Sequence, residues 1–239
     1  MAVLGTVAGE IASLVTHALR YPAAIGRRWA VRPGPAQAPV RPLVVLPGLA
    51  DNTAIFADLK AALDRCGAGP VVSFSYPLLL HDVRKAAARL ADQVEQLCGV
   101  TGAARVDLVG HSLGGLIARY YVQRLGGHAR VGTAVTVGTP HGGTVAAWLL
   151  SPMPLARQLR PGSPLITELA GPAPGCGTRF VTFSSEGDEL VLPGRHGRFE
   201  HPDLDVRNVV LPGVGHLALA ADRRVVGEIC ALFGARSAW

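Results

Sequence analysis

The sequence predicts an α/β domain with about six mainly parallel strands and helices on both faces of the sheet. The chain of 239 residues has the length of one domain. Its residues are 49% hydrophobic and only 17% charged, which excludes an intrinsically disordered chain. From residue 43 onward, short apolar runs alternate with segments of helical periodicity. Because parallel strands are buried on both faces of their sheet, fully apolar runs of this kind favour a parallel arrangement.

The predicted strands are short runs rich in β-branched and apolar residues. They are expected at residues 43–46, 71–74, 106–109, 133–137, 180–184 and 206–211. Helical periodicity predicts helices near residues 54–66, 83–98, 113–125 and 222–233. The second of these has the clearest pattern, because seven apolar residues form one stripe and Asp82 is placed to cap its first turn.

Two segments fall outside this alternation. Residues 1–42 are expected to form an amphipathic helix and a proline-rich linker, and residues 43–239 to form the α/β domain. Within that domain, residues 140–178 contain no predicted strand, which is typical of a functional insertion. The apolar residues of this insertion suit a lid or the wall of an acyl pocket, and they equally suit plain helical packing on the sheet.

The N-terminal segment also bears on where the protein acts. Glu10 interrupts the apolar residues 2–19, which argues against a membrane-spanning helix. No lysine or arginine precedes Arg20, so the segment is a poor secretory signal. We expect a cytoplasmic or membrane-associated protein rather than a secreted one. Residues 2–29 could pack on the domain or make peripheral contact with a membrane surface.

Charge and cysteine content exclude other classes of protein. The net charge is +6, but the cations are mostly single arginines scattered along the chain, so no nucleic-acid partner is expected. The four cysteines contain no C-x-x-C pair, so no metal site is expected either. Free thiols and disulfides both remain open for these residues, which are Cys66, Cys98, Cys176 and Cys230.

A G-x-S-x-G motif at residues 110–114 directly follows the predicted strand 106–109 and precedes a predicted helix. Such a turn holds its serine, here Ser112, in a strained backbone conformation with the hydroxyl exposed. Side chains at positions 110 and 114 would collide with the neighbouring strand and helix, so glycine suits both. Ser112 is therefore the predicted nucleophile, and a purely structural tight turn is the alternative.

A serine nucleophile needs a base and a carboxylate that orients the base. Asp188 and His216 follow Ser112 in the required chain order, each in a glycine-containing loop just after a predicted strand. We therefore predict His216 as the base and Asp188 as its acid. The competing acids are Glu186, the main rival, and Glu189, Asp203 and Asp205, and the competing histidines are His196 and His201.

The loop after the first predicted strand could stabilise the oxyanion of the reaction. A glycine turn at Gly48 before a helix can aim the backbone N–H of Leu49 at a developing negative charge. The backbone N–H of Leu113, the residue after the nucleophile, would be the second donor. An ordinary loop with a helix cap at Asn52 is the alternative, and both roles could coexist.

Over residues 43–233 the sequence resembles the α/β-hydrolase superfamily, and more closely the small single-domain bacterial lipases and esterases. The motifs that carry this resemblance are Leu46-Pro47-Gly48, Gly110-His111-Ser112-Leu113-Gly114-Gly115, Gly138-Thr139-Pro140-His141-Gly142-Gly143-Thr144, Asp188 with Val191 and Pro193, and Gly213-Val214-Gly215-His216. The resemblance implies a triad of Ser112, Asp188 and His216, and an oxyanion hole of Leu49 with Leu113.

The sequence departs from this pattern in two places. The first oxyanion loop of such lipases usually begins with His-Gly, whereas here Pro47 precedes Gly48, which removes a side chain that orders the loop. No strand pair is predicted before Leu43, so the fold resembles the minimal version of the α/β hydrolase. His141 belongs to the lipase-like motif but precedes Asp188 in the chain, so we expect a structural or pocket-edge role for it.

These observations predict a serine hydrolase that cleaves carboxylic esters, with lipid-like esters favoured by the apolar insertion. No cofactor is expected. An acyltransferase or a thioesterase would use the same triad, because only the acyl acceptor or the leaving group differs. A catalytically silent, membrane-associated binding protein is the alternative from another class, although it would have little reason to retain all three triad positions.

Overall fold

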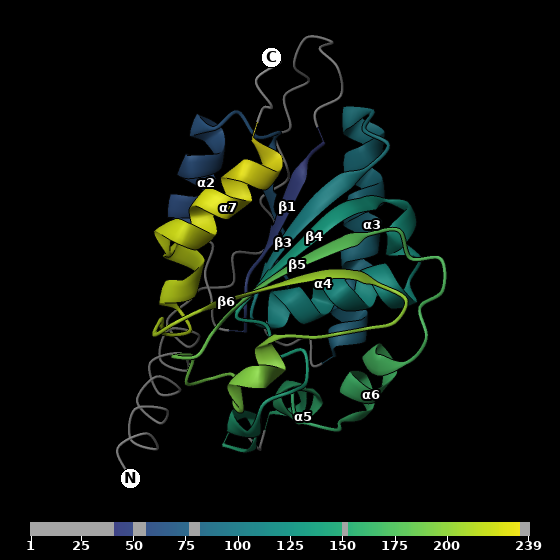
Figure 1. Ribbon diagram of the computed structural model, residues 1–239. Helices are drawn as coiled ribbons and strands as arrows, with labels where there is room; N and C mark the ends of the chain where they lie inside the picture. Colours follow the sequence, from purple (N-terminus) through teal and green to yellow (C-terminus); the bar gives the residue numbers. More distant parts are fainter. Residues whose placement is uncertain (1–40, 50–55, 77–81, 150–152, 235–239) are drawn as a thin grey trace.

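The computed structural model describes residues 41–49, 56–76, 82–149 and 153–234 (Figure 1). The predicted N-terminal helix and most of its linker lie outside these residues, as does Asn52. The division of the chain at residue 42 therefore stays a prediction. In the part of the chain that is described, no helix is both long enough and apolar enough to cross a membrane.

Six strands form one sheet in the order β2-β1-β3-β4-β5-β6. Every neighbouring pair is parallel, which confirms the predicted fold class. Most strand ends lie within two residues of their predicted positions. The strands are β1 (Leu43–Leu46), β2 (Val71–Ser73), β3 (Val106–His111), β4 (Val131–Val137), β5 (Arg179–Ser185) and β6 (Asp205–Leu211).

Helices cover both faces of the sheet (Figure 1). Alternating side chains of each strand point to opposite faces, so Val44 packs with α3 and α4 while Val45 packs with α2 and α7. The four helices are α2 (Ala57–Arg65), α3 (Val83–Thr101), α4 (Leu113–Arg124) and α7 (Arg223–Phe233). Asp82 caps α3 as predicted, because its side chain accepts a hydrogen bond from the backbone N–H of Arg84.

The insertion between β4 and β5 contains short helices and, among its described residues, no strand. Proline occupies the first turn of both α-helices in it, where the missing N–H costs no helical hydrogen bond. These are α5 (Pro154–Gln158) and α6 (Pro164–Ala170), and the insertion also contains the 3₁₀ turn η3 (Val145–Trp148). Three other 3₁₀ turns lie outside it: η2 (Gly127–Ala129), η4 (Gly194–Gly197) and η5 (Ala218–Ala221).

Because all strands are parallel, their carboxyl ends meet at one edge of the sheet. The segments after β1, β3, β4, β5 and β6 therefore gather there, and these segments contain the predicted site residues.

Candidate active site

Ser112 occupies the sharp turn between β3 and α4. Its backbone dihedrals are φ 51° and ψ −120°, and among the described residues it is the one non-glycine residue with positive φ. L-amino acids rarely adopt this conformation, because the side chain crowds the backbone. The N–H of Ser112 donates to the carbonyl of Val137 at the end of β4, 2.8 Å away, which helps to hold the turn.

The glycines around Ser112 allow the turn to pack tightly. A Cβ atom at Gly110 would lie 2.5 Å from the backbone nitrogen of Gly115, inside the first turn of α4. A Cβ atom at Gly114 would overlap the carbonyl oxygens of Leu46 and Pro47. The first turn of α4 therefore sits directly against the end of β1, and no larger residue fits there without moving backbone.

His216 and Asp188 form a buried pair after β6 and β5. The Nδ1–H of His216 donates to Oδ2 of Asp188 over 2.8 Å, and the two residues are 3% and 4% exposed. With the proton on Nδ1, the neutral ring carries its lone pair on Nε2, the nitrogen that a general base would use. The pair therefore has the tautomer that base catalysis requires.

Asp188 is held as a carboxylate. Burial alone would raise its pKa, but the charge of His216 and its hydrogen bond lower the pKa, and so do the N–H groups of Val191 and Leu190. The net effect is a pKa below the usual 3.8. Both of these N–H groups donate to Oδ1 at 2.9 Å, leaving Oδ2 for the histidine.

Two further contacts bring His216 to the turn that holds Ser112. Nε2 of His111, the residue before the nucleophile, lies 3.2 Å from the backbone oxygen of His216, and the two rings are 4.9 Å apart between centroids. A Cβ atom at Gly138, which follows Val137, would lie 3.3 Å from the ring of His216. The ends of β3 and β4 thus contact the base directly.

Ser185 joins the two loops that carry Asp188 and His216. Its hydroxyl oxygen accepts the N–H of Gly187 at 3.0 Å in the first loop and the N–H of Val214 at 2.9 Å in the second. Gly187 packs so closely on Gly213 that a Cβ atom would lie 2.8 Å from its carbonyl carbon. The sequence analysis did not identify Ser185, because its partners are revealed only by the pairing of β5 with β6.

The competing acids have other surroundings. Glu186 is exposed, and Asp203 accepts the N–H of Ala173 in the insertion. Asp205 is exposed at the start of β6. Glu189 lies beside Gly215, with one carboxylate oxygen buried and without a hydrogen-bond partner among the described residues.

The other histidines have different partners. His196 bonds the carbonyl oxygen of Gly143 and His201 that of Gly171, both in the insertion. His141 is buried against Oγ1 of Thr136 and the ring of Phe199. Burial and the neighbouring charge of Arg119 lower the pKa of His141 well below 6.5, so the ring is neutral. This placement agrees with a structural role for His141.

The predicted oxyanion loop is ordered by a tyrosine that the sequence analysis missed. Oη of Tyr76 lies 3.1 Å from the carbonyl oxygen of Pro47 and 3.0 Å from that of Gly48. Leu49 follows and packs on the core, while Leu113 begins α4 on the other side of the turn. Tyr76 thus contacts the loop next to Pro47, and the role of the two leucine N–H groups stays a prediction.

Residues 41–49, 56–76, 82–149 and 153–234 contain no group of three histidine, cysteine or acidic side chains that could hold a metal ion.

The parallel sheet and its helices have the α/β-hydrolase fold. The fold is similar to that of Bacillus licheniformis lipase BlEst2 in its mature form, with 15% identity, a TM-score of 0.67, and 87% of this chain and 96% of that chain covered. Aspergillus fumigatus lipase B gives 19% identity, a TM-score of 0.65 and coverage of 75% and 49%. The product of the gene lin2722 from Listeria innocua has 14% identity and a TM-score of 0.62, with 79% of this chain and 92% of that chain covered.

A family model then narrows the class. The model described as Palmitoyl protein thioesterase matches residues 42–162, just over half of the chain. The chain therefore belongs to this family, and its fold is similar to that of the lipases named above. The matched region includes Leu49, Ser112 and Leu113, whereas Asp188 and His216 lie beyond it.

Proposed function

We propose that the protein is a serine hydrolase that cleaves lipid-like carboxylic esters through an acyl-enzyme on Ser112. Oγ of Ser112 attacks the ester carbonyl while Nε2 of His216 accepts its proton. His216 then protonates the leaving alcohol. Water attacks the acyl-enzyme, its proton passes to His216, and Ser112 regains a proton as the acid is released. Asp188 stabilises the imidazolium in both halves of the reaction.

One observation carries this proposal: the buried hydrogen bond between His216 and Asp188 lies beside the strained turn of Ser112. In the described structure Asp188 has no cationic partner other than His216. Its buried carboxylate would therefore stabilise the ring of His216 when that ring becomes charged during the reaction. His111 ends β3 just before Ser112, and Gly138 follows β4; their contacts with His216 support a site shared by the three side chains.

The first turn of α4 supports charge stabilisation. Ser112 immediately precedes this helix, whose N-terminal N–H groups favour negative charge. We assign the two oxyanion donors to the backbone N–H groups of Leu113 and Leu49. In other hydrolases, losing one such donor costs about 2.7–4 kcal/mol of transition-state stabilisation.

The insertion supports a lipid-like substrate and contact with a membrane surface. Large apolar side chains are exposed there, including Trp148 at 57% and Leu149 at 53%, together with Val145 and Met153. This surface borders the loop that carries Asp188, because the N–H of Val145 donates to the carbonyl of Leu192 at 2.9 Å. Exposed apolar surface beside a catalytic loop suits substrates with long acyl chains. The proposal keeps the prediction that the protein is cytoplasmic or membrane-associated rather than secreted.

Hydrolysis of acyl thioesters is a second candidate, favoured by the family to which the chain belongs. The steps on Ser112, His216 and Asp188 would be the same. A thiol leaving group has a pKa of about 8.5, far below that of an alcohol, so its departure needs less help from the imidazolium. An enzyme adapted to thioesters would therefore have a higher kcat/KM for a thioester than for the ester with the same acyl chain.

A combined labelling and kinetic experiment tests the proposal. A fluorophosphonate probe should label the wild type and fail to label Ser112→Ala, whereas Ser73→Ala, on the edge strand β2 two strands away from β3, should label normally. Labelling that survives Ser112→Ala would remove Ser112 as the nucleophile. Ratios of kcat/KM for matched esters and thioesters of increasing chain length then decide between the two candidates.

A further inference from the structure

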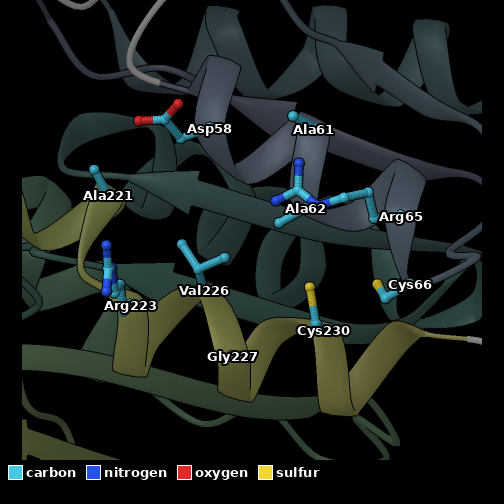
Figure 2. Close-up of a pocket in the computed structure, with 10 residues that line it drawn as sticks. All are labelled: Asp58, Ala61, Ala62, Arg65, Cys66, Ala221, Arg223, Val226, Gly227 and Cys230. Atoms are coloured by element: carbon cyan, nitrogen blue, oxygen red, sulfur yellow. The ribbon is translucent and has the colours of Figure 1, made fainter.

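Helices α2 and α7 lie side by side on one face of the sheet (Figure 1). A cavity of about 650 Å³ lies between them (Figure 2). We name it the α2–α7 groove. Its walls combine small apolar residues with charged ones: Asp58, Ala61, Ala62, Arg65, Cys66, Ala221, Arg223, Val226, Gly227 and Cys230. The groove is formed by helices that take no part in the proposed hydrolysis.

Two of the four cysteines line this groove from opposite sides. Cys66 ends α2, and Cys230 lies in α7; Figure 2 shows their sulfur atoms in the same part of the groove. Both residues are partly exposed, so small molecules can reach them. The thiol of Cys66 donates to the carbonyl of Leu63 over 3.3 Å. Cys98 is a buried residue of α3, and Cys176 lies in the insertion.

The ends of the two helices also meet at the backbone. The N–H of Gly234 donates to the carbonyl of Cys230 at 2.7 Å. A Cβ atom at Gly234 would lie 3.0 Å from the carbonyl oxygen of Cys66 and 3.4 Å from its Cβ atom. The residue that follows α7 is therefore in direct contact with Cys66, which places Cys230 only one turn of helix away.

The two thiols interact. Burial and a hydrogen bond with Cys66 raise the pKa of Cys230 to about 11. Cys230 therefore keeps its proton near neutral pH, so we assign the first nucleophilic attack to Cys66. The side chains of Arg65 and Arg223 line the same groove. The charge of Arg65 opposes part of the rise in the pKa of Cys230.

We propose that Cys66 and Cys230 form a redox-active dithiol that low-molecular-weight disulfides convert into a disulfide between α2 and α7. The thiolate of Cys66 attacks the small disulfide, so that a mixed disulfide forms, the original S–S bond breaks and one small thiolate leaves. Cys230 then gives its proton to solvent and attacks the sulfur of Cys66, which releases the second small thiolate. Two protein thiols are oxidised, and the small disulfide is reduced to two thiols.

Titration of the full-length protein with oxidised glutathione tests this proposal. The intact mass should fall by two hydrogen atoms, the number of free thiols should fall from four to two, and peptide mapping should join Cys66 to Cys230. Dithiothreitol should reverse all three changes. A variant with Cys98→Ser and Cys176→Ser should behave as the wild type, because it keeps the pair.

The single variants Cys66→Ser and Cys230→Ser should no longer form the intramolecular disulfide. Cys66→Ser should react with oxidised glutathione more slowly than Cys230→Ser. Stable glutathione adducts on the wild type without closure, or a bridge that maps to Cys98 or Cys176, would overturn the proposal. Mapping of the wild type alone decides the question if a variant fails to fold. The outcome does not depend on the hydrolase activity.

Discussion

Replacing Asp188 by asparagine should leave the fold intact and remove most of the activity. The asparagine oxygen can still accept the N–H groups of Leu190 and Val191, which bond Oδ1 at 2.9 Å. At the position of Oδ2, however, the amide would present N–H donors to Nδ1 of His216. The ring would respond by taking its proton on Nε2, and it could then no longer accept a proton from Ser112.

The magnitude follows from the tautomer. Where a triad aspartate is replaced in this way, the wrong tautomer lowers kcat by about 10⁴-fold, which corresponds to about 5.4 kcal/mol at 1.36 kcal/mol per tenfold change. We expect a loss of about 10³–10⁴-fold for Asp188→Asn. Because the pKa of Asp188 lies below its usual 3.8, the wild-type carboxylate is ionised throughout pH 5–8, and the loss should be similar across that range.

Steady-state hydrolysis of a p-nitrophenyl ester measures this loss, and urea denaturation checks the free energy of unfolding. Glu186→Gln is the matched control, since it neutralises the exposed rival carboxylate two positions earlier, and its activity should stay within about twofold of wild type. A loss below tenfold in Asp188→Asn, or an equal loss in Glu186→Gln, would refute the assignment of the acid.

Three further changes probe the surroundings of the site. Ser185→Ala leaves the N–H groups of Gly187 and Val214 without their acceptor, and because water reaches both groups only partly, urea denaturation should show a loss of about 2–3 kcal/mol in the free energy of unfolding. A loss below about 0.5 kcal/mol, the size of an ordinary surface substitution, would exclude the role of Ser185 in joining the two loops. Tyr76→Phe should lower kcat about tenfold with little change in KM, because the oxyanion loop loses its hydroxyl partner; an unchanged kcat would contradict this. The depressed pKa of His141 means that the unfolded chain binds a proton below about pH 6.5 that the folded protein does not, so stability falls as pH falls. From pH 6.5 to 5.5 this costs about 1 kcal/mol, and His141→Gln should remove that part of the slope in urea titrations at both pH values.

The order of the elements and the sharp turn at Ser112 were predictable because they rest on local patterns. The motif around Ser112 needs a strand before it and a helix after it, and both are visible as apolar periodicity. The parallel sheet then brings the later strand ends to the same edge, which is why Asp188 could be placed near His216 from chain order. The structure joins these two residues directly.

The supporting residues were not predictable, because their partners lie far away in the chain. Tyr76 gives no local signal of its contact with Pro47 and Gly48, and the pairing of Cys66 with Cys230 depends on how α2 and α7 pack. The short helices of the insertion are similarly hidden, since five and seven residues are too few for clear periodicity. Proline at the start of each was the available signal.

The end of β4 contacts both Ser112 and His216. The carbonyl of Val137 accepts the N–H of Ser112, and Gly138 packs against the ring of His216. The insertion begins only two residues later, at Pro140. The central strand β4 thus supports both the hydroxyl of Ser112 and the imidazole of His216. We therefore expect the distance between these two groups to change little when the insertion is rearranged. Chimeras that exchange the insertion for one of another shape could therefore alter which acyl groups are accepted without retuning the proton transfer itself.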